Sequence, residues 1–206
     1  MGHTVEFDFL SKEGLRCVGL ALTNGHRCGY VAVPEGHVLY GVRYGDTLPE
    51  AVAFVTEELM KGEDISRRGI IPVFIAALSG NMNRLDVVID VHGSLTYSES
   101  GEGNYPAPST EKVWWFGFDC GHSGDGKDFS IMDDRTREMY ESRPFLFSEG
   151  PIRSTEYVKQ HCKLLARQLW YIGQMVAQSA LPAGKDESSQ DRFNFEHLIE
   201  KSFEEI

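Results

Sequence analysis

Three apolar segments separated by very short turns fill the first 33 residues, and this spacing constrains the fold more than any other feature. The segments TVEFDFL (4–10) and LRCVGLALT (15–23) flank SKEG, four residues that end in glycine, and RCGYVAV (27–33) follows the tight turn NGH. Segments of this kind on either side of a short glycine-containing turn are typical of a β-hairpin. The chain is therefore predicted to begin with antiparallel β structure.

The middle of the chain is predicted to add one helix and two strands. LPEAVAFVTEELMKG (48–62) has apolar residues at helical spacing, with a proline near its start and a glycine at its end. IIPVFIAAL (70–78) is apolar throughout and fits either a strand or a buried helix. LDVVIDVHG (85–93) and KVWWFGFD (112–119) are rich in β-branched and aromatic residues, which favours strands. SESGEGNYPAPST (98–110) has the composition of a loop.

The last third of the sequence has a different periodicity. In STEYVKQHCKLLARQLWYIGQMV (154–176) apolar residues recur at alternating steps of four and three, so one stripe of a long helix should face the core. LPAGKDESSQDR (181–192) resembles a flexible linker in composition, and residues 193–206 are predicted to form a short terminal helix. We therefore expect one α+β domain over residues 1–180, an antiparallel or mixed sheet packed against helices.

The net charge limits the ligands that the chain can bind. Its 206 residues include 31 acidic and 20 basic side chains, for a formal net charge of −11. Extended nucleic acid is held by clustered lysines and arginines, so a broad nucleic-acid footprint is not expected. A phosphate-bearing ligand would have to be small, and held by a few basic residues, backbone N–H groups or a bound cation.

Cysteine usage and hydropathy suggest the compartment. The four cysteines lie far apart without CxxC spacing, which is typical of a reduced, cytoplasmic protein rather than a disulfide framework. No run approaches the roughly 18 apolar residues that a membrane-spanning helix needs, and the first residues lack the apolar core of a signal peptide. The sequence therefore predicts a cytoplasmic, unprocessed protein with no membrane partner. It leaves open whether identical chains assemble.

Reactive side chains gather where two of the predicted strands end. Asp90 and His92 belong to the end of one strand, and Asp119, His122 and Asp125 follow at three-residue intervals from the end of the other. If the two strands are close in the sheet, these side chains meet at one edge. Carboxylate and imidazole groups are ordinary ligands of zinc, manganese or iron, and the expected ligands of such a divalent ion are Asp90, His92, Asp119 and His122.

A metal is not the only interpretation of this pattern. An aspartate can instead orient a histidine that acts as a general base, which makes His92, Asp119, His122 and Asp125 the candidate catalytic residues. The structural alternative is also open for each residue, because an aspartate after a strand often caps a turn and a histidine often bonds a backbone carbonyl.

Three further stretches supply candidate ligand-binding residues. GHRCGYVAVPEGHVLYG (25–41) carries polar and aromatic side chains between glycines, and HGSLTYSE (92–99) combines a glycine with hydroxyl groups. Arg153 precedes a helix whose N-cap is expected at Ser154 or Thr155, and a helix N-terminus beside an arginine can bind an anion. A structured loop and a surface salt bridge are the structural alternatives. The candidate ligand-binding residues are Arg27, Tyr30, His37, Gly93, Ser94, Thr96, Tyr97, Trp115 and Arg153.

Several of these phrases also resemble a known family. GHRCGYVAVP-GH, VHGSLT, WWFGFDCGHSGD and R-x-x-EYV are similar to a family of small uncharacterised bacteriophage and prophage proteins, which read VHGG-[LI]-T and WWFGFDC-x-H-x-GD. The similarity spans roughly residues 25–170, and Ser94 stands where the family pattern has glycine. The resemblance implies a phage accessory role in the host cytoplasm. Small phage proteins of this kind are often counter-defence factors that cleave or sequester nucleotide-derived immune signals.

Three functions are compatible with these features. The first, which the charge favours over the second, is a hydrolase that acts on a small nucleotide-derived molecule through the Asp/His residues, with or without a divalent metal ion. The second is a protein that sequesters such a molecule without turnover, with Tyr30, Tyr97 or Trp115 stacking on the base and Arg153 binding phosphate. The third is an interaction protein whose acidic surface inhibits a host protein.

Overall fold

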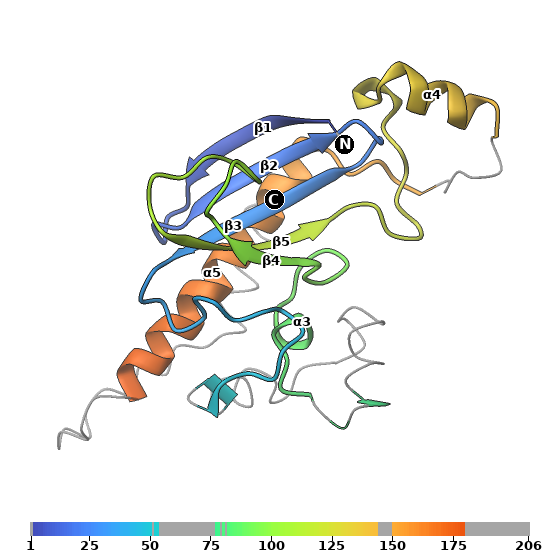
Figure 1. Cartoon of the computed structure of the whole chain (residues 1–206). Helices are drawn as coiled ribbons and strands as arrows, with labels where there is room; N and C mark the ends of the chain where they lie inside the picture. Colours follow the sequence, from blue (N-terminus) through green and yellow to red (C-terminus); the bar gives the residue numbers. More distant parts are fainter. Residues whose placement is uncertain are drawn as a thin grey trace.

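The computed structural model describes residues 2–50, 52–53, 77–78, 80, 82–143 and 150–179. A five-stranded antiparallel sheet forms its centre, with strand order β1-β2-β3-β5-β4 (Figure 1). The predictions of an α+β fold and of three antiparallel strands at the start of the chain are confirmed. The strands are β1 (His3–Leu10), β2 (Arg16–Leu22), β3 (Arg27–Pro34), β4 (Tyr97–Ser100) and β5 (Val113–Asp119).

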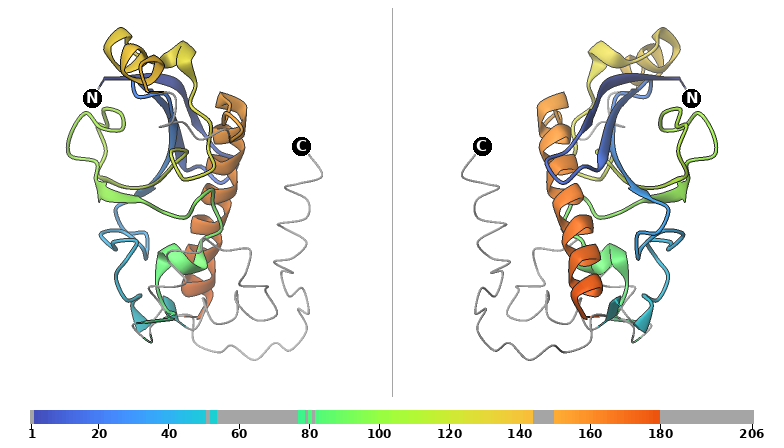
Figure 2. Two further views of the ribbon diagram at one scale, coloured as in Figure 1. Left: turned by 90° about the vertical axis from the view of Figure 1, so that its right-hand side faces the viewer. Right: turned by 90° about the vertical axis from the view of Figure 1, so that its left-hand side faces the viewer.

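One long helix covers one face of the sheet. Helix α5 (Thr155–Ser179) lies against β2 and β3, and two side views show it running along a single face (Figure 2). Ser154 caps its first turn, because the Ser154 hydroxyl accepts a hydrogen bond from the Tyr157 N–H at 3.2 Å. The stripe expected to face the core does so: Val158, Cys162, Leu165, Leu169 and Ile172 are all buried.

The opposite face of the sheet is covered by the connection between β4 and β5, which curves over it on the side away from α5 (Figure 2). Alternate residues along each strand point to opposite faces, so the sheet has two separate cores. The core under α5 includes Cys17, Val31, Phe116 and Phe118. The other core is built around aromatic residues and contains Val18, Leu20, Leu22, Cys28, Tyr30, Ala32, Ala107, Val113 and Trp115, with Tyr97 and Tyr105 packed against it.

The strand predicted at residues 85–93 is wrong. Leu85–Val88 form a single helical turn, α3, and an irregular segment follows it. All four residues of this turn are buried, Asp86 included, so the sequence has no periodic polar face that would separate a strand from a buried helical turn. A bidentate ion pair between Arg84 and Asp86 stabilises the start of the turn. The loop predicted at 98–110 is partly wrong as well, since its first three residues complete β4.

Two short elements complete the described part of the chain. The 3-10 turn η2 (Phe129–Ile131) and helix α4 (Asp134–Glu141) follow the loop after β5. Within the described ranges, no helix is long and apolar enough to cross a membrane. The linker at 181–192, the helix at 193–206 and most of the segments 48–62 and 70–78 lie outside the described residues.

Candidate functional site

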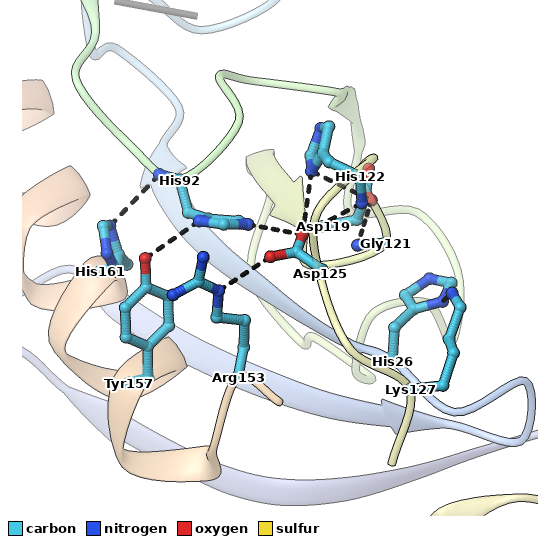
Figure 3. Close-up of polar contacts among 10 residues, drawn as sticks. All are labelled: His26, His92, Asp119, Gly121, His122, Asp125, Lys127, Arg153, Tyr157 and His161. Carbon is cyan, nitrogen blue, oxygen red and sulfur yellow. Dashed lines mark hydrogen bonds and ion pairs between the residues drawn. The ribbon is translucent and has the colours of Figure 1, made fainter. Parts of the chain in front are cut away.

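The site forms where the loop after β5 meets the segment before β4 and the start of α5 (Figure 3). Gly126 donates its N–H to the Pro151 carbonyl at 3.0 Å, which holds the approach to α5 beside the 119–126 loop. Gln168 of α5 holds the other segment: its side chain bonds both the N–H and the carbonyl of Asp90 at 2.8 Å. Three segments distant in sequence are thereby joined, one pair through main-chain atoms and the other through the Gln168 side chain.

Asp125 is the centre of the site. Its side chain is only 3% exposed and accepts hydrogen bonds from Arg153 Nε at 2.8 Å, His92 Nε2 at 2.9 Å and the His122 N–H at 3.1 Å. Burial alone would raise the pKa of this carboxyl. The hydrogen bonds from Arg153 and His92 outweigh burial, and the pKa lies below its ordinary value. Asp125 is therefore a carboxylate at neutral pH.

His92 is held on both sides of its ring. Its Nε2 contacts Asp125, and its Nδ1 lies 3.0 Å from the hydroxyl of Tyr157 on the first turn of α5. The backbone N–H of His92 donates to His161 Nδ1 at 3.2 Å. Burial, followed by the neighbouring His92 and the positive charge of Arg153, lowers the pKa of His161 to about 4, so His161 is neutral at neutral pH.

His122 completes the cluster and brings one atom without a partner. Its Nδ1 is buried and has no hydrogen-bond partner among the described residues, although Asp125 Oδ2 lies 3.7 Å away and Asp119 Oδ1 3.8 Å away. Gly93, with φ of 66°, allows the ring to approach, because a Cβ at this position would overlap the His122 imidazole. Buried polar atoms normally have a hydrogen-bond partner, and a bound ion would explain why this nitrogen has none.

Three of these side chains could hold a divalent cation. One ligand atom from each of His92, His122 and Asp125 can be chosen so that all lie within 4.8 Å of one another. Ligands about 2.0–2.2 Å from a tetrahedral zinc ion stand roughly 3.3 Å apart, so small side-chain rotations would close the site around an ion. The donor set, two imidazoles and a carboxylate, suits zinc, manganese or iron.

The structure brings together only part of the metal site expected from sequence. His92 and His122 are in the cluster, but its carboxylate is Asp125 in place of Asp90. Asp119 lies next to His122, yet its Oδ1 accepts the Gly121 N–H at 2.9 Å and so closes the loop locally. Asp90 precedes His92 on the segment that Gln168 anchors, and the donor cluster found in the described part of the chain does not include it.

Two residues of the site were missed by the sequence analysis. Tyr157 and His161 lie four residues apart on α5, so both project from one side of the start of the helix, and Arg153, two residues before α5, lies beside them (Figure 3). The guanidinium of Arg153 lies 4.8 Å from the Tyr157 ring centre, and the Tyr157 and His161 rings are 4.5 Å apart. The four-residue spacing of Tyr157 and His161 within the predicted helix, close after Arg153, was the signal that could have identified them.

A second pair of basic groups lies close to the loop. Lys127 Nζ is 3.5 Å from His26 Nδ1, and the His26 ring lies beside Gly121 (Figure 3). Burial, followed by the charge of Lys127, lowers the pKa of His26, so this imidazole is neutral at neutral pH.

Most of the other residues expected to bind ligand are structural. Arg27 is buried and pairs with Glu6 at 2.8 Å and Asp128 at 2.9 Å. His37 Nε2 lies 3.1 Å from the Leu169 carbonyl, and Ser94 donates to the Asp86 carbonyl at 2.6 Å. Tyr30, Tyr97 and Trp115 belong to the core on the far face of the sheet, and Thr96 is exposed where its backbone N–H pairs with the Gly117 carbonyl. Arg153 and Gly93 are the two that the structure places in the site.

Comparison with known proteins gives no assignment: no family model, curated protein or solved structure matches the chain. The fold and the site therefore define the class directly. This is an α+β protein in which two histidines, an ionised aspartate and an arginine converge beside the start of a helix.

Proposed function

We propose that the protein is a metal-assisted hydrolase of a small, nucleotide-derived molecule. One observation carries the proposal: the buried Nδ1 of His122, without a hydrogen-bond partner in the described structure, faces the same carboxylate that His92 contacts. A polar atom left unpaired inside a protein costs about 1–3 kcal/mol, and an ion held by the three side chains would remove that cost.

The three donors leave room for catalysis. Structural zinc sites have four protein ligands, whereas catalytic sites have three and keep a position open for water or substrate. A divalent ion bound there would supply Lewis-acid chemistry and lower the pKa of its bound water. Asp125 would hold the ion and also orient Arg153, so its substitution should affect both functions.

Arg153 is suited to bind the phosphate. Its Nε is held by Asp125, and its two terminal nitrogens have no hydrogen-bond partner among the described residues. A guanidinium fixed at one nitrogen still offers a planar pair of donors that matches phosphate oxygens. The side chain is 26% exposed, so a ligand can reach it from solvent.

The same contacts favour turnover over capture. A sequestering protein was expected to stack its ligand on Tyr30, Tyr97 or Trp115, but these rings belong to the core on the opposite face of the sheet. Sequestration thereby loses its expected base-binding surface. An acidic interaction protein would not need an unpaired buried imidazole beside an ion-paired arginine. The resemblance to phage proteins makes nucleotide-derived immune signals in the host cytoplasm the first substrates to test.

The test is a metal titration followed by an activity assay. The full-length protein, freed of metal with a chelator, is titrated with zinc and manganese by calorimetry and then incubated with a pool of cyclic and linear nucleotides that mass spectrometry follows. We expect one bound ion and a hydrolysed nucleotide. His122→Ala should lose both, and His3→Ala, which removes an exposed histidine at the start of β1, should lose neither.

Two results would contradict the proposal. Failure of the parent protein to bind either ion or to alter any nucleotide would reject the hydrolase. Recovery of an intact nucleotide from the heat-denatured protein would replace turnover by capture.

A further inference from the structure

Tyr157 occupies a position from which it can control His92. Its hydroxyl lies 3.0 Å from His92 Nδ1, while Nε2 on the other side of the ring lies 2.9 Å from Asp125 Oδ2. An ionised carboxylate can only accept hydrogen bonds, so Nε2 carries the hydrogen in this contact. In a neutral imidazole Nδ1 is then an acceptor, and the Tyr157 hydroxyl donates to it.

Binding of a cation requires the opposite arrangement. A metal ion takes the lone pair of Nε2, so a neutral His92 must carry its hydrogen on Nδ1. That N–H then needs an acceptor at the position of the Tyr157 oxygen. A tyrosine hydroxyl can donate or accept a hydrogen bond after rotation about one bond, whereas an ammonium, a guanidinium or a backbone N–H can only donate one.

The remainder of Tyr157 is fixed in place. Its ring packs at a tilt against the His161 ring, with the ring centres 4.5 Å apart, and the Arg153 guanidinium lies 4.8 Å from its centre. His161 also accepts a hydrogen bond from the backbone N–H of His92 at 3.2 Å, which fixes the main chain at His92. With both rings held, rotation of the hydroxyl is the smallest movement that satisfies His92 in both states.

We infer that Tyr157 is a positioning residue that lets His92 exchange its contact with Asp125 for a divalent cation, by donating to Nδ1 in one state and accepting from it in the other. The inference rests on the proposed metal site and deepens it. Under this inference, the affinity of His92 for the cation depends on Tyr157, a residue of α5 that supplies no ligand atom.

Tyr157→Phe tests this role, because it removes the hydroxyl and leaves the ring contacts. Cobalt and zinc affinities are measured on the full chain, cobalt by its visible absorption and zinc by competition. We expect the dissociation constant to rise about 10–100-fold, as is usual for partners of metal-bound histidines. Tyr171→Phe is the matched control, since Tyr171 is a buried tyrosine further along the same helix and away from the site. It should bind both ions as the parent does.

Nitrogen NMR of histidine-labelled parent protein gives an independent readout. His92 should carry its hydrogen on Nε2 without metal and on Nδ1 with zinc. A His92 that already carries its hydrogen on Nδ1 without metal would overturn the inference.

The outcomes separate the inference from the proposed function. If Tyr157→Phe binds cobalt as tightly as the parent does, the positioning role is wrong and the metal site stands. If the parent binds no cation, both are wrong. A Tyr157→Phe protein that loses affinity only because its unfolding temperature falls below that of Tyr171→Phe would assign Tyr157 a structural role and overturn the inference.

Discussion

Each side of the sheet has a cluster that contains several ring side chains, and the two clusters differ in exposure to solvent and in hydrogen bonding. On the far face, Tyr30, Tyr97 and Tyr105 pack edge to face, the hydroxyls of Tyr30 and Tyr105 bond one another, and Trp115 is fully buried. On the face under α5, the side chains of His122 and Arg153 are 29% and 26% exposed, and both retain nitrogens without partners among the described residues.

This difference separates stability from chemistry. An aromatic cluster closed to solvent contributes mainly buried area and ring contacts, which stabilise the fold. A half-open cluster with unsatisfied donors and a charged pair contributes little area but can bind a ligand. We therefore expect substitutions in the site to change activity with small effects on unfolding, and substitutions in the aromatic cluster to do the reverse. The predictions below test that division.

The largest expected effect is on turnover. His122→Ala should lower the rate of hydrolysis roughly 10²–10⁴-fold, and the double change with His92→Ala should be little worse, because members of one catalytic unit are not additive. Thermal unfolding should change little, since the substitution also removes a buried nitrogen that has no hydrogen-bond partner in the described residues. Single-turnover kinetics and calorimetry on the three variants measure both effects. Additive losses would show that the two histidines act separately.

The aromatic cluster should give the largest loss of stability. Trp115→Ala should lower the free energy of unfolding by about 3–5 kcal/mol, because it leaves a large cavity beside Tyr30 and Val113. Trp115→Phe should cost less, since it keeps a ring and removes an indole N–H that is buried without a hydrogen-bond partner in the described chain. Urea titration gives both values. Cation affinity should equal that of the parent in both proteins. A large loss of cation affinity in Trp115→Phe would show that the aromatic cluster and the site depend on one another.

The sequence predicts this division only in part. Short turns, strand-favouring residues and helical periodicity are local signals, and they located β1, β2, β3, β5 and α5. The segment 85–93 was misassigned because a strand needs a neighbouring strand as its hydrogen-bond partner. Here the Gln168 side chain bonds the N–H and the carbonyl of Asp90 instead.

The residues of the site were also predicted only in part from the sequence. His92, His122, Asp125 and Arg153 could be named because reactive groups follow apolar segments and precede a helix. The choice of Asp125 over Asp119 depends on how the loop folds, with Asp119 bonded to the Gly121 N–H, and spacing alone does not encode it. Alternation along β3 and β5 could have placed Tyr30 and Trp115 in a core, since their neighbours Val31 and Phe116 face α5.

A third prediction concerns pH. The pKa of His161 is lowered from 6.5 to about 4, so the unfolded chain binds a proton below pH 6.5 that the folded chain does not. The resulting stability is complete above pH 6.5 and is lost as the pH falls to about 4, a change of about 3 kcal/mol. His161→Gln does not titrate and should lack this part of the pH dependence. Urea titrations of the metal-free parent and His161→Gln proteins between pH 4 and 7 measure this difference. The same pH dependence of the free energy of unfolding in both proteins would refute the prediction.

The smallest expected effect lies at Ser94, on the segment that runs from the site to β4. Its φ of 86° is a conformation that favours glycine, yet its buried hydroxyl bonds the Asp86 carbonyl at 2.6 Å. Ser94→Ala loses the hydrogen bond and keeps the strain, so it should destabilise the fold by about 1 kcal/mol. Ser94→Gly loses the same bond but relieves a backbone strain of about 1 kcal/mol, so its stability should stay within about 0.5 kcal/mol of the parent. Urea titration separates the two variants, and cation affinity should be unchanged in both; an equal loss of stability would show that the left-handed backbone at Ser94 carries no strain.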